Sequence, residues 1–126
     1  MAKTKKHILV VDDEPAWLKI LSYILRKKGF EVREESSAAA ALEALKEYKP
    51  DMIVSDVRMP EMNGFDFLDH IKRSRKNSST PFVFISAIDD EDSRHAAQNL
   101  GATDYITKPF NEDEVVRTIT RHLNEL

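Results

Sequence analysis

Two adjacent aspartates, Asp12 and Asp13, directly follow a short apolar run, Ile8–Val11. Neighbouring carboxylates repel one another and are costly to remove from water unless a positive charge lies nearby. A third aspartate, Asp56, closely follows a second apolar run, and Lys108 closely follows another. Together these residue types could bind a divalent cation and a phosphoryl group, provided that the fold brings them to one place.

The chemistry that such a set supports is metal-dependent phosphoryl transfer. Oxygen ligands alone select Mg²⁺, with Mn²⁺ as an alternative, over zinc or copper, and Mg²⁺ typically binds through one or two carboxylates plus a phosphate. A carboxylate can also attack a phosphoryl group to form an aspartyl phosphate. We therefore expect Asp12, Asp13 and Asp56 at a Mg²⁺ site, with Asp56 as the nucleophile and Lys108 neutralising the phosphoryl oxygens.

Other residues near the predicted strand ends complete this interpretation. The Ser86 hydroxyl and the backbone N–H of Ala87 are expected to donate hydrogen bonds to phosphoryl oxygens, and Trp17 is expected near the metal site. A simpler interpretation makes Asp12 and Asp13 caps of the first helix and Ser86 an ordinary strand-end hydroxyl. The pattern that they form with the third aspartate and the lysine favours the metal site.

Short apolar or β-branched runs alternate along the chain with stretches of helical spacing. The runs are too short for helices and predict strands, namely Ile8–Val11, Phe30–Val32, Met52–Val54, Phe82–Ile85 and Tyr105–Ile106. Elsewhere apolar residues recur three and four positions apart, as on one face of a helix. These sets are Trp17, Ile20, Leu21, Ile24 and Leu25; Ala41, Leu42 and Leu45; Phe67, Leu68 and Ile71; Ala96, Ala97 and Leu100; and Val115, Val116, Ile119 and Leu123.

Five strands that alternate with five helices predict an α/β fold. The first, third and fourth runs are almost wholly apolar, which is typical of a parallel sheet with helices on both faces. With right-handed crossovers, the pattern predicts a doubly wound (βα)5 domain. Such sheets place their sites at the carboxyl ends of the strands, so the aspartates, the serine and the lysine are expected along one edge.

Composition excludes several classes of function. The chain has 126 residues, 41% of them hydrophobic, which suits a single domain, residues 1–126. Its net charge of -3 comes from 19 basic and 22 acidic residues, so direct nucleic-acid binding is not expected. There is no cysteine, and no apolar run is long enough for a signal peptide or membrane span, which predicts a cytoplasmic protein without membrane contact.

Several segments carry a family resemblance. VVDDEP, SDVRMPEMNGFDFL, ISA and GATDYITKPF follow one another in this order, each at the end of a predicted strand. They are similar to the signature segments of receiver domains, the phosphoacceptor module of two-component response regulators, including single-domain chemotaxis regulators. The resemblance extends from about His7 to the fifth predicted helix and implies a flavodoxin-like fold with strand order 2-1-3-4-5.

The resemblance implies a role for each residue of the metal site. Asp56 resembles the phosphoacceptor, and Asp13 with Asp56 resembles the direct side-chain ligands of the metal. Asp12 would act mainly through metal-bound water. The backbone carbonyl of Arg58 resembles the remaining protein ligand to Mg²⁺.

The resemblance also assigns residues to phosphate binding and switching. Ser86 resembles the hydroxyl residue that moves towards the phosphoryl group, and Tyr105 resembles the aromatic residue that then turns inward. Ser86, Ala87 and Lys108 would bind the phosphoryl oxygens, and the Lys108–Pro109 peptide bond would be cis.

Two positions are those at which receiver domains tune hydrolysis of the phosphoryl group. Arg58 stands two residues after the phosphoacceptor, and Ile88 stands two residues after Ser86. A long basic side chain and a branched apolar one are expected to hinder the hydrolytic water or fail to orient it. The aspartyl phosphate is therefore expected to be long-lived.

The function that follows is a phosphorylation switch. A phosphohistidine on a histidine kinase or histidine phosphotransfer protein would donate to Asp56 with Mg²⁺, and the face of the fourth helix, fifth strand and fifth helix would change. The chain would catalyse its own phosphorylation and dephosphorylation but turn over no metabolite. The downstream effector is unknown, and the expected state is a monomer or a phosphorylation-linked dimer.

Three alternatives to the switch remain. A phosphatase with an aspartate nucleophile is disfavoured because the residue two positions after Asp56 is Arg58, where such hydrolases have a second acid. A dinucleotide-binding module is disfavoured because DDEPAW follows the first strand in place of a glycine-rich loop. The third is a receiver fold with degenerate switching.

The chain could be a complete single-domain regulator, a relay protein, or part of a longer protein.

Overall fold

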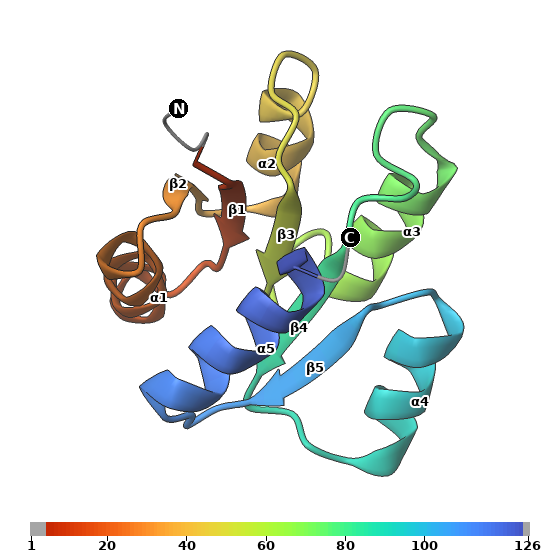
Figure 1. The fold of residues 1–126 in the computed structure, drawn as a ribbon. Coiled ribbons are helices and arrows are strands. Elements are labelled where there is room, and N and C mark those ends of the chain that lie inside the picture. The colour runs from red at the N-terminus through yellow and green to blue at the C-terminus, as the bar shows by residue number, and fades with distance from the viewer. Residues whose placement is uncertain (1–4, 125–126) are drawn as a thin grey trace.

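The computed structural model describes residues 5–124, in which five strands and five helices alternate (Figure 1). The strands are β1 (His7–Val11), β2 (Glu31–Glu35), β3 (Met52–Ser55), β4 (Phe82–Ser86) and β5 (Asp104–Thr107). The helices are α1 (Pro15–Lys27), α2 (Ala38–Ala44), α3 (Gly64–Arg73), α4 (Glu91–Asn99) and α5 (Glu112–Asn124). In residues 5–124, every helix is too short or too polar to cross a bilayer.

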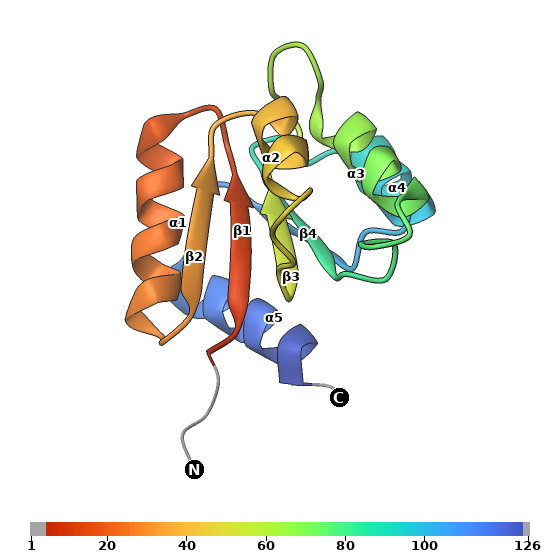
Figure 2. The same ribbon diagram turned by 90° about the horizontal axis from the view of Figure 1, so that it is seen from above.

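The sheet has the predicted topology. Its order is β2-β1-β3-β4-β5, and every neighbouring pair is parallel. Figure 2 shows β1 and β2 side by side and running in the same direction. The register pairs Val11 with Ser55, and Ser86 with Thr107. Because these are the last residues of their strands, the segments that follow begin at one edge of the sheet.

Helices cover both faces of the sheet, as predicted. Successive side chains of a strand point to opposite faces, so Ile8 and Val10 pack with α1 and α5, whereas Leu9 and Val11 pack with α2 and α3. Both clusters are closed to solvent, and Figure 1 shows α1 and α5 on one side of the sheet and the other three helices opposite. The two cores fix the positions of the strands between the helices.

The second strand was the poorest sequence prediction. The apolar run predicts a strand over Phe30–Val32, whereas the strand spans Glu31–Glu35 and pairs with β1 along its full length. Since β2 is an edge strand, its outward side chains are charged and an apolar run does not reveal it. Phe30 precedes the strand and packs against the core instead.

Helix starts follow the local sequence. Pro15 occupies the first turn of α1, where its missing N–H has no consequence. The side chains of Ser37, Asn63 and Asp90 cap α2, α3 and α4 by accepting backbone N–H bonds. These caps fix where the loops from β2, β3 and β4 end, and therefore the shape of the site at the strand ends.

Candidate functional site

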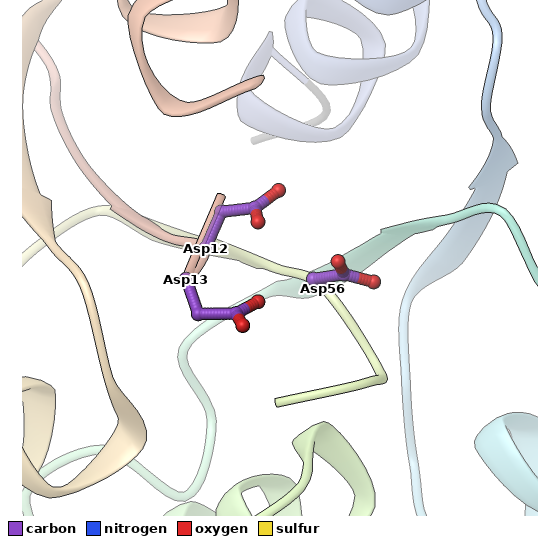
Figure 3. Close-up of side chains that lie close together, drawn as sticks. All are labelled: Asp12, Asp13 and Asp56. Carbon is purple, nitrogen blue, oxygen red and sulfur yellow. The ribbon is translucent and has the colours of Figure 1, made fainter. Parts of the chain in front are cut away.

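Three carboxylates converge where β1 and β3 end. Asp12 and Asp13 follow β1, and Asp56 follows β3, its neighbour in the sheet. The backbone N–H of Asp56 donates to the carbonyl of Val11 at 3.0 Å, which ties the two strand ends together. One ligand oxygen of each aspartate lies within 4.8 Å of the others, and Figure 3 shows Asp12 and Asp13 adjacent with Asp56 beside them.

Lys108 reaches this cluster from the end of β5, the edge strand beside β4. Its backbone N–H donates to the carbonyl of Ser86 at 2.8 Å, and its peptide bond to Pro109 is cis. The ammonium nitrogen lies 2.8 Å from Asp12 Oδ2 and 3.1 Å from Asp56 Oδ2, and only 3% of the side chain is exposed. One buried cation therefore bridges carboxylates from two strands.

Burial and pairing shift the pKa values of Asp12 and Lys108. Burial raises the pKa of Asp12, and the hydrogen bonds from Lys108 and from the backbone N–H of Glu14 only partly oppose this. Burial alone would lower the pKa of Lys108, but its bonds to Asp12 and Asp56 outweigh that effect and raise it, so the ammonium stays protonated. One ammonium for three acids leaves excess negative charge, which a divalent cation would offset.

The simpler interpretation of the first two aspartates as helix caps does not match the geometry. Glu14 occupies the N-cap position of α1, and its side chain makes no capping hydrogen bond. Asp12 Oδ1 accepts the N–H of Glu14 at 3.0 Å, ahead of the helix. The carboxylate is thus held by the turn while its second oxygen faces Lys108.

A cleft opens beside the acids. Asp56 Oδ1 accepts the backbone N–H of Val57 at 2.7 Å, while Oδ2 faces Lys108. Ser86 is fully buried, and its hydroxyl oxygen accepts the N–H of Ile88 at 3.1 Å. The cleft is lined by Asp13, Glu14, Asp56, Arg58, Ser86 and Ala87. Five of the residues predicted for metal or phosphate binding thus line one open space, whereas Asp12 and Lys108 are not among its lining residues.

Tyr105 lies on β5 and is not among the residues that line this cleft. Its hydroxyl donates to the carbonyl of Ile88 at 2.5 Å, and the Arg94 guanidinium lies over its ring at 4.9 Å. Arg94 also donates to the Thr107 hydroxyl at 2.6 Å and pairs with Asp89 at 2.7 Å. Arg94 therefore joins the β4–α4 loop, α4 and β5 around the tyrosine, a role that the sequence did not reveal.

Two further residues contact the lysine. The Trp17 ring centroid lies 4.8 Å from the Lys108 ammonium, and Glu14 Oε1 lies 3.9 Å from it. Trp17 thus lies beside the acidic cluster, as expected, and it also contacts the lysine, which no sequence pattern indicates. Glu14, as the third acid in the DDE run, was the available signal for a further charge at this site.

The model of the response regulator receiver domain family matches residues 8–120. The chain belongs to the receiver domain family. Receiver domains are the signalling switches of two-component response regulators, so the resemblance carried by the strand-end segments is confirmed.

Individual relatives agree with this family. An uncharacterized 14.6 kDa protein of Leptolyngbya boryana is 36% identical over 91% of this receiver domain and 88% of its own length. The probable transcriptional regulatory protein TcrX of Mycobacterium tuberculosis is 38% identical over 86% of this chain but only 46% of its own length. The receiver domain therefore spans about half the length of that regulator.

The fold is also that of solved receivers. The chemotaxis protein CheY4 of Vibrio cholerae superposes with a TM-score of 0.89 and 28% identity, covering 94% of this chain and 98% of its own. This likeness, together with the sheet order, confirms the flavodoxin-like fold with order 2-1-3-4-5.

Proposed function

We propose that the chain is the phosphoacceptor of a two-component phosphorelay and that Asp56 receives the phosphoryl group from a phosphohistidine of a histidine kinase or histidine phosphotransfer protein. The observation that carries this proposal is the placement of the Asp56 carboxylate in an open cleft, with Lys108 at 3.1 Å and two further acids beside it. A nucleophile next to a fixed cation suits phosphoryl transfer, which depends on positioning and charge neutralisation.

The phosphoryl transfer would use side chains and a backbone N–H of this chain. A carboxylate oxygen of Asp56 attacks phosphorus, the bond between phosphorus and the histidine nitrogen breaks, and the electron pair leaves with the imidazole, which takes up a proton. Lys108 neutralises charge on the phosphoryl oxygens, while the Ser86 hydroxyl and the Ala87 N–H donate to them. All four residues lie at the strand ends, and Ser86 would move towards the phosphoryl group, away from the Ile88 N–H whose hydrogen bond it accepts in this structure.

The donor set fits Mg²⁺. Asp12, Asp13 and Asp56 offer only oxygen ligands, and the backbone carbonyl of Arg58 is proposed to complete the protein's share. When bound, Mg²⁺ would supply the charge that lets two anions, carboxylate and phosphoryl group, approach each other. Mn²⁺ fits the same ligands.

The output is proposed to be a changed surface. A phosphoryl group on Asp56 would draw Ser86 towards itself, and Tyr105 would leave the Ile88 carbonyl that it contacts in this structure and turn inward. The face of α4, β5 and α5 would then bind a downstream effector or a second copy of the chain. The protein would catalyse its own phosphorylation and dephosphorylation, without a metabolic substrate.

Intact-mass spectrometry tests this proposal. Incubation with a small-molecule phosphodonor and Mg²⁺ is expected to add the mass of one phosphoryl group, located by digestion on the peptide that contains Asp56. A chelator should prevent the addition, because the excess negative charge of the cluster would repel the donor. A folded chain that acquires no adduct in the presence of Mg²⁺ would rule out the proposed chemistry.

The lifetime of the adduct provides a separate prediction. Arg58 lines the cleft, and Ile88 follows Ser86 in the neighbouring loop; neither side chain can accept a proton from an attacking water. Ile88→Glu and Arg58→Asn are each expected to speed loss of the phosphoryl group by roughly tenfold, since both introduce a group that can orient water.

The loss is followed as decay of the adduct mass after the donor is removed. Arg75→Asn, a change of the same kind at an exposed arginine outside the cleft, is the matched control and should leave the decay rate as it is. Unchanged decay in both cleft variants would show that these side chains do not limit hydrolysis.

A further inference from the structure

The Lys108 ammonium has a side that no hydrogen bond in residues 5–124 occupies. An ammonium carries three N–H donors, and here it bonds to Asp12 at 2.8 Å and to Asp56 at 3.1 Å. Glu14 Oε1, at 3.9 Å, is beyond hydrogen-bond distance. With 3% of the side chain exposed, water has little access to the remaining side. The indole of Trp17 lies there, 4.8 Å from the nitrogen to the ring centroid.

The loop that carries the lysine also holds this indole. Trp17 lies in α1 and is half-buried. Its ring packs against Phe110 with centroids 5.3 Å apart and an interplanar angle of 52°. Phe110 is two residues after Lys108, so one segment supplies both the cation over the ring and the aromatic contact beside it. The orientation of the indole is thereby coupled to the position of the ammonium.

We propose that Trp17 is a positioning residue for Lys108, an inference that rests on the proposed phosphoryl transfer. The negative face of the indole attracts the ammonium and keeps it between Asp12 and Asp56. Trp is the strongest cation–π partner among the aromatic residues, and the attraction grows when water is excluded. An aromatic ring face also holds the ammonium without forming a conventional hydrogen bond to it. The N–H groups of Lys108 therefore stay available to carboxylate and phosphoryl oxygens.

The competing interpretation is that Trp17 only fills space between α1 and the loop. The chain offers a direct way to separate the two, because it contains one tryptophan. Biosynthetic incorporation of mono-, di- and trifluorotryptophan therefore changes this ring alone. Fluorine withdraws electron density from the ring face and weakens the cation–π attraction, while the shape changes little.

The rate of phosphorylation from a small-molecule donor with Mg²⁺ is expected to fall stepwise with the number of fluorine atoms. The total drop should be on the order of fivefold, the size that a partial loss of one desolvated cation–π contact allows. The melting temperature of each form is measured alongside. Rates that follow the melting temperature and not the fluorine number would show a purely structural role and overturn the proposal.

Substitutions give an independent test. Trp17→Phe keeps an aromatic face and is expected to retain most of the rate, whereas Trp17→Leu should lose about tenfold. Tyr23→Leu is the matched control: Tyr23 is on the same helix and has the Lys27 ammonium 5.3 Å from its ring, but it is 65% exposed. Its replacement should leave the rate unchanged.

The outcomes separate this inference from the proposed function. A chain that acquires no phosphoryl group in any form contradicts the proposed function and the role of Trp17 with it. A normal adduct on the unmodified chain, with equal rates across the fluorinated forms and in Trp17→Leu, overturns the role of Trp17 alone.

Discussion

Asp56→Asn is expected to abolish the phosphoryl adduct while making the fold more stable. The amide oxygen of asparagine is a poor nucleophile, so no acyl phosphate forms. The substitution also removes one of three clustered negative charges, two of which pair with the single ammonium of Lys108. Asparagine can still accept hydrogen bonds from Val57 and Lys108, so the gain in free energy of unfolding without metal should be on the order of 1 kcal/mol.

Mg²⁺ should reduce or remove the variant's stability advantage. A cation that binds only the folded state stabilises it according to its affinity, and the wild-type cluster offers one more anionic ligand than the variant. Urea unfolding of both proteins, with Mg²⁺ and with a chelator, is therefore expected to show the variant ahead without metal and the advantage reduced or lost with it. Equal stability under both conditions would mean that the three carboxylates do not strain the metal-free fold.

A second aspartate serves as the control for this experiment. Asp69 lies on α3, where it pairs with Arg73 at 3.0 Å, and it is not among the residues that line the cleft. Asp69→Asn should keep the adduct, and its stability should not respond to Mg²⁺ more than that of wild type. If Asp56→Asn still acquired an adduct, and a chelator prevented the adduct on wild type, the phosphoacceptor would be another residue.

The sequence predicts the interior strands well because a strand that is buried on both faces is a continuous apolar run. Ile8–Val11 and Phe82–Ile85 are continuous apolar runs, and both form interior strands of the sheet. The edge strand β2 has no continuous apolar run, and Glu31 and Glu35 lie within it. It is a strand because it pairs with β1, and this pairing depends on the rest of the sheet and not on local composition.

The same distinction applies to the candidate site. Parallel strands bring their carboxyl ends to one edge, so the meeting of Asp12, Asp56 and Lys108 could be expected from topology alone. The contacts of Trp17 with Lys108 and of Arg94 with Tyr105 could not. They depend on rotamers and on the exact path of two loops, and cation–π partners have no fixed spacing along a chain.

Gly64→Ala is expected to destabilise the protein strongly, because this position has no room for a side chain. A Cβ at Gly64 would lie 2.3 Å from the carbonyl oxygen of Asp56 and 2.8 Å from both the Val57 Cα and the Phe84 ring. Two of these neighbours are backbone atoms, so no rotamer change can relieve the overlap. The free energy of unfolding should fall by about 3 kcal/mol, and the melting temperature by roughly 10 °C.

The loss should extend to the site, because the atom that must move is the carbonyl of the proposed phosphoacceptor. Gly29→Ala is the matched control: Gly29 has φ of +95°, but a Cβ there meets nothing within 4 Å. Its replacement carries only backbone strain, about 1 kcal/mol, and should leave phosphorylation unchanged. If Gly64→Ala were no less stable than Gly29→Ala, the close approach of α3 to the end of β3 would not be what holds Asp56 in the cleft.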